Sequence, residues 1–543
     1  MKDKVASAAG KYIPKEGIKG VANAIKNKAQ EIRAARAGAG KEDSMDGGSE
    51  EQEYQEVSIE GAQGEGEGAG KKRPIKQMIN GIKKKIEEKQ RLKQAKAQAA
   101  LVPNISESFL IINHEKEESA QSIPPPTPEE AVNGIMRELL SSKHLEAQGS
   151  NRVRDQGAGL LRALNQPKVD MRELMKQCFI GIPDEIKGLR PLIWRILLKY
   201  LPEDTAQWDS HLKSSRETYE EWRQELIIKP KIKAEEEYNN ERKKVIDHPL
   251  STSSTSQWNK FFKDQDLWDE IEKDVKRTRT DMTFFYKAVD DSQNQHIEQL
   301  MKQAECKKAE LSNADREKYI ETHSDVLWRV LFIYAKLNPG VKYVQGMNEV
   351  LAVLYYCFWS FSDFAVIPRE NLECDLFFCF TNLMTEIRDG FIRDLDKEES
   401  GITGKVAIFS EILRIVDPEV HKNLEAQQVN HQFYSLRWFM LLMCQEFDMS
   451  NVIRLWDTLF SDPDRFSFLN FICVATVQTQ REICLTGDFA DCMENLQRAT
   501  DSITDIRVLI RQAKNVLATY IKMQESEQAW DDLNEDIQQN YHV

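Results

Sequence analysis

The chain has 543 residues, with 74 lysines and arginines, 88 aspartates and glutamates, and a formal net charge of −14. Its hydrophobic content of 41% is slightly below that of a typical globular protein. The shortage is concentrated before residue 126, where aromatic residues are almost absent and little apolar surface is available to offset the entropy lost on folding. Composition therefore predicts a long, mostly disordered N-terminal arm (1–126) followed by one large folded body.

Charge and cysteine usage exclude several classes of function. The first 100 residues have a net charge of +6, which leaves −20 for the rest, and an acidic body argues against a nucleic-acid-binding surface. The nine cysteines form no C-x-x-C pair and the histidines no H-E-x-x-H motif, which disfavours disulfide frameworks and metal sites. The N-terminus lacks an apolar signal region, and the strongest apolar run, 350–361, is too short to span a bilayer. We therefore expect a cytoplasmic protein whose only contact with endomembranes is peripheral.

The arm contains a repeated basic pattern on either side of an acidic spacer. The spacer, 42–70, has ten acids, seven glycines and no basic residue. The pattern I-K-x-x-x-N-x-I-K-x-K-x-x-E occurs at 18–31 and again at 75–88, with apolar residues at helical spacing. Residues 71–96 carry a net charge of +9. Basic amphipathic helices at 18–31 and 71–96 would suit an anionic membrane surface, although a solvated charge run without a specific partner is an equal alternative.

The remainder of the chain has the pattern of an all-α protein. Thr127, Pro128 and Glu130 form a capping pattern, which predicts a linker helix within 127–165. From about residue 160 onward, amphipathic runs of 10–20 residues alternate with short turns rich in Asp, Pro, Gly and Asn. The clearest helices are predicted over residues 188–201, 326–337, 433–447 and 451–460.

Two polar clusters in this body could carry chemistry. Asp274 and Arg277 lie three residues apart, and on one helix face the carboxylate could orient the guanidinium, although such a pair is most often a surface salt bridge. Tyr343 and Gln345 lie in the segment 338–349, between a Pro-Gly turn and an apolar helix. Alone, this second cluster would be a helix N-terminus with capping side chains.

A third cluster, Arg454-x-Trp456-Asp457, completes a series of five motifs whose order is informative. The other four are Gly181-Ile182-Pro183-x4-Gly188-Leu189-Arg190-x3-Trp194, Ile271-x-x-Asp274-x-x-Arg277-Thr278, Tyr343-x-Gln345-Gly346-Met347-Asn348, and Asp375-x-Phe377-x-x-Phe380-x-x-Leu383-Met384. In content and order, the five motifs resemble the TBC domain of Rab GTPase-activating proteins over roughly residues 175–515. A stretch such as 332–340 is similar to one branch of that family.

The resemblance implies a two-lobed helical TBC domain, assigned to 166–535, that accelerates GTP hydrolysis by a Rab partner and so regulates vesicle traffic. By the same resemblance, Arg277 enters the Rab active site to stabilise developing phosphate charge, and Gln345 positions the attacking water. Asp274 would orient Arg277, and Tyr343 would fix the loop that presents Gln345. The resemblance implies no cofactor of the protein's own, because GTP and Mg²⁺ are bound by the Rab.

Two further points follow from the motif register. Arg279 lies outside the arginine-finger register, and we expect it at the solvent or at the rim of the partner contact.

The offset of 68 residues between Arg277 and Gln345 exceeds that of compact family members. The excess, 290–316, is either a tolerated surface insertion or a partner-selecting or autoinhibitory element.

The main alternative function is a non-catalytic Rab-binding scaffold or membrane tether that works through the basic repeats. A fold kept only for binding would need neither Arg277 nor Gln345, so the presence of both favours catalysis.

Overall fold

The computed structural model describes residues 125–141, 151–228, 257–290, 292, 320–391 and 401–541. All of them belong to one compact unit of the chain, Lys96–Val543. The basic repeats at 18–31 and 75–88, the spacer at 42–70 and most of the 290–316 insertion lie outside the described residues, so the predictions made for them stay predictions.

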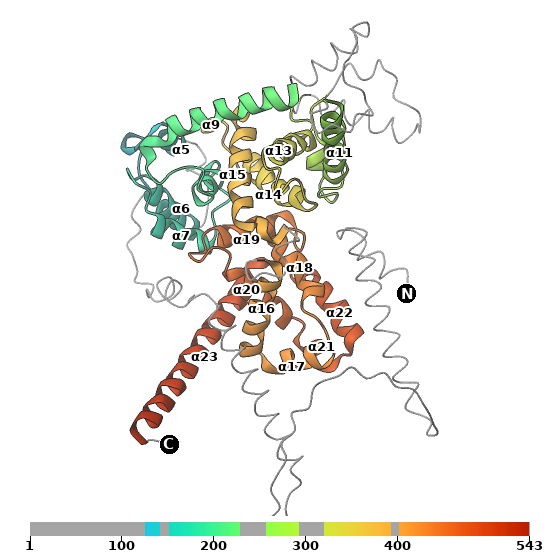
Figure 1. Ribbon diagram of the computed structural model, residues 1–543. Coiled ribbons are helices and arrows are strands. Elements are labelled where there is room, and N and C mark those ends of the chain that lie inside the picture. The colour runs from blue at the N-terminus through green and yellow to red at the C-terminus, as the bar shows by residue number, and fades with distance from the viewer. Residues whose placement is uncertain are drawn as a thin grey trace, which may run out of the picture. The chain divides into compact units, whose positions relative to one another are not determined.

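The described residues form helices joined by short turns and include no strand, which confirms the predicted all-α class (Figure 1). Within these parts of the chain, no helix is both long and apolar enough to cross a membrane. The α-helices are α5 (Gly134–Ser141), α6 (Asn151–Leu164), α7 (Met171–Ile180), α8 (Leu189–Leu197), α9 (Trp208–Arg223), α11 (Gln257–Val275), α13 (His323–Leu337), α14 (Met347–Ser360), α15 (Leu372–Ile387), α16 (Ile402–Val416), α17 (Pro418–Ala426), α18 (Gln432–Met440), α19 (Met449–Phe460), α20 (Phe468–Gln478), α21 (Arg481–Thr486), α22 (Phe489–Gln497) and α23 (Ile506–Tyr541). Short 3₁₀ turns are η1 (Pro128–Glu130), η3 (Thr205–Gln207), η5 (Thr283–Tyr286), η8 (Arg369–Asn371), η9 (Arg388–Phe391) and η11 (Ala499–Ser502), and η4 (Gln224–Ile228) is a π-helical turn.

Side-chain caps explain where several of these helices begin. Asp170 accepts a hydrogen bond from the Glu173 N–H at the start of α7, and Asp448 accepts one from the Asn451 N–H at the start of α19. These carboxylates satisfy N–H groups that have no partner inside the helix. The same residue types mark the turns in the sequence, which is why the helix starts are largely readable from it.

The segment 127–165, predicted as one linker helix, contains η1, α5 and α6. The Thr127–Glu130 capping pair is present, with the Thr127 N–H donating to the Glu130 carboxylate at 2.8 Å. The segment packs against the rest of the body, because Leu139 of α5 and Leu160 of α6 are fully buried in the core.

The helix predicted over 433–447 is shorter in the structure. α18 ends at Met440, and the following residues Leu442 and Met443 have positive φ angles of 48° and 57°, which no α-helix accommodates. The apolar pattern continues through these residues because they are buried in a turn. A prediction from periodicity alone therefore placed the end of the helix too late in the sequence. We refer to residues 441–447 as the support turn.

The helices form two groups that α19 joins. In the first group, α8, α9, α11 and α13–α15 pack among themselves and α7 packs against α6; in the second, α16–α18 and α20–α23 pack among themselves. α19 contacts α8 and α14 of the first group and α23 of the second, and it also packs against α7; it lies between the groups in Figure 1.

The joint at α19 is built on one buried carboxylate. The side chain of Asp457 is 0% exposed and accepts hydrogen bonds from Arg190 Nε at 3.1 Å, Trp194 Nε1 at 2.9 Å and the Ile182 N–H at 3.0 Å. Burial opposes the charge of Arg190, but Asp457 and Asp184 outweigh burial and raise the Arg190 pKa above its usual value. The opening motif and the Arg454-x-Trp456-Asp457 motif, far apart in sequence, are therefore parts of one contact.

A second buried carboxylate holds α15 against the N-terminal helices. Asp375, also fully buried, accepts hydrogen bonds from Arg195 Nε at 3.1 Å, from the Tyr200 hydroxyl at 2.9 Å and from Arg216 Nη2 at 3.2 Å. The carboxylates of Asp457 and Asp375 are thus each paired with an arginine and hydrogen-bonded. A buried ion is tolerated under this condition.

Replacing Asp457 by alanine should destabilise the protein severely, because the buried Arg190 guanidinium would keep only the exposed Asp184 as a counter-charge. The Trp194 indole and the Ile182 N–H would also lose their acceptor. The expected loss is about 3–5 kcal/mol in the free energy of unfolding, measured by urea denaturation of the two proteins. Asp501→Ala is the matched control, since its pair with Arg498 is exposed on both sides and should leave the urea midpoint unchanged. A variant at position 457 as stable as the wild type would contradict the assigned role.

Candidate functional site at the two finger segments

The segment 276–282, called the arginine-finger segment after the predicted role of Arg277, begins where α11 ends. The apolar face of α11 is buried through Ile271 and Val275, and Asp274 between them is only 6% exposed. Arg277 lies in the turn after the helix, so it does not share a helix face with Asp274 as the spacing had predicted. Its guanidinium nevertheless pairs with the Asp274 carboxylate, and Nε donates to the Lys273 carbonyl at 3.1 Å. With 62% of its side chain exposed, Arg277 is held by its own segment while facing outward.

The segment 338–346, called the glutamine-finger segment after the predicted role of Gln345, connects α13 to α14. Gly346 is the residue before α14 and has a φ of +108°, a region that side chains with a Cβ rarely adopt. Gln345 is partly exposed, and no described residue forms a hydrogen bond with its carboxamide. Tyr343, two residues earlier, is buried. The segment thus presents one amide side chain outward from an anchored backbone.

Buried hydrogen bonds join the two segments. The Tyr343 hydroxyl lies 3.0 Å from the second oxygen of Asp274 and 3.1 Å from Asn348 Oδ1. Asn348 Nδ2 donates to Thr278 Oγ1 at 2.8 Å, while Asn348 Oδ1 accepts the Gly346 N–H at 3.0 Å. Asp274 therefore contacts the segment of each finger, and Asn348 ties the residue after Arg277 to the residue after Gln345.

The protonation state of Tyr343 suits this arrangement. Burial, reinforced by the neighbouring Asp274 carboxylate, raises the pKa of Tyr343 well above its usual value. The hydroxyl consequently stays protonated at neutral pH and can donate its hydrogen bond.

Of the predicted site residues, Arg277 and Tyr343 each form a hydrogen bond with Asp274, and Gln345 lies on the same short segment as Tyr343. Their catalytic roles stay predictions. The structural roles of Asn348 and Thr278 were missed, although both are part of the quoted motifs. The sequence contained a signal for both, since each is a short polar residue within three positions of Arg277 or Gln345 in a quoted motif.

The prediction for Arg279 is wrong. Arg279 is 7% exposed, and its guanidinium Nη1 donates to the Cys444 carbonyl at 2.9 Å and the Phe447 carbonyl at 3.3 Å. Nη2 pairs with Asp281 at 3.1 Å. The backbone at Arg279 has a φ of +43°, which turns the side chain inward onto the support turn. Instead of facing a partner, Arg279 binds the arginine-finger segment to the buried support turn.

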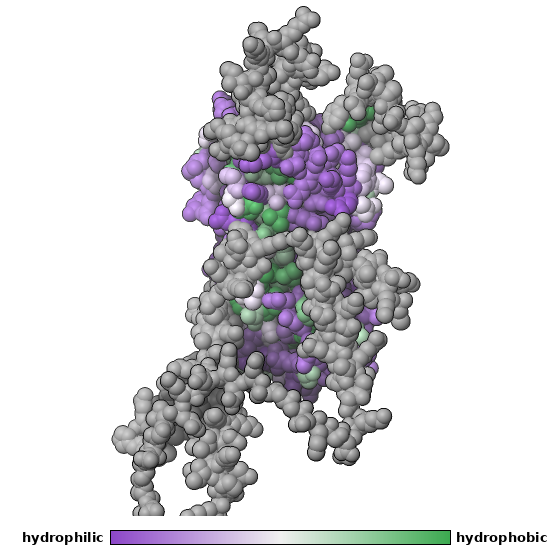
Figure 2. Space-filling view, turned by 45° about the vertical axis from the view of Figure 1, so that its right-hand side comes forward, coloured by the Kyte–Doolittle hydropathy of each residue, from purple (hydrophilic) through white to green (hydrophobic). Residues whose placement is uncertain are grey.

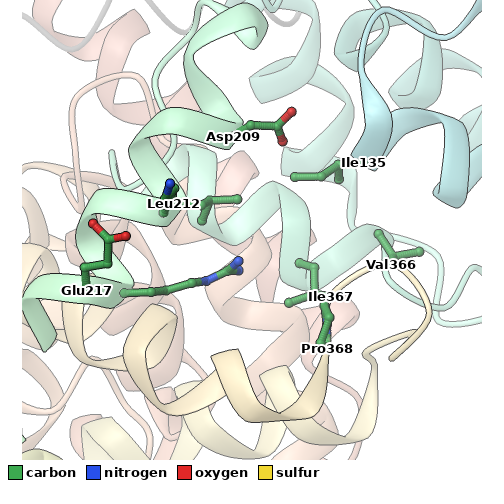
Figure 3. A pocket seen from close by; sticks show the side chains of 9 residues that line it. Ile135, Asp209, Leu212, Glu217, Val366, Ile367 and Pro368 are labelled. Carbon is green, nitrogen blue, oxygen red and sulfur yellow. The ribbon is translucent and has the colours of Figure 1, made fainter. Parts of the chain in front are cut away.

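A surface pocket of about 340 Å³ lies elsewhere, beside α9 (Figure 3). None of its lining residues belongs to a finger segment, and one of the charged ones, Arg216, is already bound to the buried Asp375. The pocket therefore has no part in the arrangement described above. Its lining comprises Ile135, Asp209, Leu212, Lys213, Arg216, Glu217, Val366, Ile367 and Pro368.

Comparison with known proteins agrees with the motif order. The Rab-GTPase-TBC domain family matches residues 258–485. Human TBC1 domain family member 13 is 40% identical over 391 residues, which cover 65% of this chain and 95% of that protein. The chain belongs to the TBC family of Rab GTPase-activating proteins. A TBC domain-containing protein of Schizosaccharomyces pombe is 31% identical over 61% of this chain and 68% of its own length. The crystal structure of the Ypt/Rab-GAP domain of Gyp1p aligns with 68% of this chain and all of that one, at 20% identity and a TM-score of 0.48.

Alanine at position 346 should disturb the glutamine-finger segment. The added Cβ would lie 2.9 Å from Leu441 Cδ2, and alanine would also be strained at a φ of +108°. We expect a loss of about 1–3 kcal/mol in the free energy of unfolding, measured by urea denaturation. Gly340→Ala in the same segment is the control, because a Cβ added there would meet no atom within 4 Å and stability should be unchanged. Equal effects of the two substitutions would contradict this account.

Proposed function

We propose that the protein accelerates GTP hydrolysis by a Rab-family GTPase through Arg277 and Gln345, both supplied in trans. The observation that carries the proposal is the buried connection between their segments. An exposed arginine and a partly exposed glutamine extend from segments that share Asp274 and Asn348 as internal partners. Such an arrangement holds two reactive side chains at a set spacing before any partner binds.

The chemistry expected of each finger follows from its functional group. During phosphoryl transfer, charge is spread over the oxygens of the transferred group, and a guanidinium can pair with these oxygens through two donors at once. A glutamine carboxamide has a donor and an acceptor and can orient a water molecule for attack. An arginine finger is worth about 10³–10⁵ in rate, or roughly 4–7 kcal/mol of the barrier. GTP and Mg²⁺ would be those bound by the Rab, and the chain would contribute no cofactor.

Asp274 and Tyr343 would act as positioning residues in this mechanism. One Asp274 oxygen holds the Arg277 guanidinium, which limits the orientations that the long side chain can adopt. The other oxygen accepts the hydrogen bond of the Tyr343 hydroxyl. Because Tyr343 is two residues before Gln345, this bond also limits the position of the Gln345 backbone. Loss of Asp274 would release both constraints together.

The surface of the protein is compatible with a protein substrate. Figure 2 shows hydrophobic residues gathered in the middle of one face, between hydrophilic regions. Apolar surface with a polar margin is common where proteins bind other proteins.

Arg277→Ala should lower the GTP hydrolysis rate of the responsive Rab by about 10³–10⁵-fold, because the charge-stabilising group is removed. Arg277→Lys should restore little, since a lysine cannot form the planar, two-donor contact. Gln345→Ala should also remove most of the acceleration. The measurement is single-turnover hydrolysis of GTP preloaded on a panel of Rab proteins.

Arg498→Ala is the matched control for these variants. Arg498 is also an exposed arginine paired with an aspartate three residues away, but it lies in a different part of the chain. It should retain full activity. Undiminished activity of both Arg277→Ala and Gln345→Ala would contradict the finger assignment, and Rab binding without any acceleration would favour the scaffold or tether.

We further propose that the basic segments 18–31 and 71–96 attach the protein to anionic membranes, which would direct the activity to vesicle traffic. What supports this is the duplicated pattern and the net charge of +9 over residues 71–96. Each lysine or arginine near an anionic lipid surface contributes about 1 kcal/mol.

Deletion of residues 1–100 should leave Rab-dependent hydrolysis in solution unchanged and reduce co-sedimentation with phosphatidylserine liposomes. Because the attraction is electrostatic, liposome binding by the full chain should weaken steeply as salt rises. Neutral phosphatidylcholine liposomes are the control. Equal liposome binding by the truncated and full proteins would dismiss the membrane proposal.

A further inference from the structure

Two further buried charged side chains lie beside the finger segments, and the proposed roles do not use them. Glu349 is in the first turn of α14, four residues after Gln345, and is 2% exposed. Arg279 follows Arg277 by two residues and is 7% exposed. The charge and the backbone N–H of Arg279 both favour the ionised form of Glu349, although among the described residues the Arg279 guanidinium forms its ion pair with Asp281.

This pair is incompletely satisfied. Glu349 Oε2 and Arg279 Nε are both buried and form no hydrogen bond with any described residue. A buried polar atom without a partner costs free energy that a neutral side chain of the same shape would not. Because this cost favours replacement of Glu349, its presence here calls for a role other than stability.

The surroundings of the pair point to the finger geometry. Arg279 fixes the arginine-finger segment to the support turn through the carbonyl oxygens of Cys444 and Phe447. Gln445, in the same turn, also reaches the Glu349 carboxylate. Glu349 thus meets both the arginine-finger segment and the turn beneath it, from the helix that begins directly after Gln345.

We propose that Glu349 is a positioning residue for GTPase activation, whose carboxylate acts through Arg279 to fix the arginine-finger segment relative to the start of α14. This inference rests on the proposed function of Arg277 and Gln345. It complements the Asp274 contact, since the two segments are then held together by one charged group from α11 and another from α14.

The charge state of Glu349 makes the role measurable. Burial raises the pKa of Glu349 from its ordinary value of 4.5 to about 7, with Arg279 and Gln445 opposing the shift and Asp281 reinforcing it. The other titratable groups facing it are Cys444 and Tyr343, and burial raises the pKa of each, so both are neutral near pH 7. Glu349 attracts Arg279 fully only when ionised, so GTPase activation should increase between pH 6 and pH 8.

Stability should change in the opposite direction. Because the pKa of Glu349 is higher in the folded than in the unfolded protein, the folded state loses stability as pH rises from about 4.5 to about 7. Above pH 7 the buried carboxylate carries its full cost. Glu349→Gln removes the charge, and the variant should therefore melt at a higher temperature than the wild type at pH 8, with a smaller difference at pH 6.

The experiment compares the full-length wild type with Glu349→Gln and Glu349→Asp, from pH 6 to pH 8.5, on the Rab that the wild type activates. We expect Glu349→Gln to lower kcat by about 10- to 100-fold with little change in KM, the size of effect that a small misplacement of reacting groups produces. Its pH profile between 6 and 8 should be flatter than that of the wild type. Glu349→Asp should recover part of kcat and of the pH dependence.

The control is Glu373→Gln, the same change in a half-buried pair with Arg329 that has no contact with the finger segments. The Glu373→Gln variant should have a lower melting temperature and an unchanged kcat.

Wild-type kcat and pH profile in Glu349→Gln would overturn the inference, as would a loss of kcat accompanied by a lower melting temperature at pH 8. If the wild type activated no Rab, or Arg277→Ala were fully active, the proposed function itself would fail, which these variants distinguish from failure of the Glu349 role alone.

Discussion

The buried Asp457 carboxylate is the contact on which the finger geometry ultimately depends. It binds Arg190, Trp194 and the backbone after α7, and so fixes α19 against the first group of helices. The residue before it, Trp456, donates its indole N–H to the Leu442 carbonyl at 3.0 Å. One short stretch of α19 therefore secures both the joint between the helix groups and the support turn.

The support turn, in turn, meets both finger segments. Leu441 packs where Gly346 leaves no room for a side chain, and the carbonyl groups of Cys444 and Phe447 hold Arg279. The spacing between the fingers is thus set by buried contacts behind them and not by the finger side chains. An arginine and a glutamine on unconnected loops would lose conformational entropy when a partner bound, whereas segments held by buried contacts have lost much of it on folding.

The sequence was informative where the determining interactions are local or belong to a motif. Helix starts capped by aspartates, the all-α class and family membership could all be predicted, because each depends on residues close together or on a known order of motifs. The end of α18 and the burial of Arg279 could not. The carbonyl that Arg279 binds is 165 residues away, and the left-handed turn that supplies it is stabilised by Trp456 from another helix. No periodicity near Arg279 indicates that such an acceptor exists.

The buried carboxylates of the molecule differ in a way that separates support from function. Asp457 and Asp375 are surrounded by donors and join helices, so removing either would mainly cost stability. Glu349 is as deeply buried, yet one of its oxygens has no hydrogen-bond partner among the described residues, and burial raises its pKa to about 7. A group that lowers stability when charged has no structural reason to be retained, and its position four residues after Gln345 fits the positioning role proposed for it. On this argument, the carboxylates that build the fold have donors on both oxygens, whereas the carboxylate proposed to position Arg277 and Gln345 has one oxygen without a partner among the described residues.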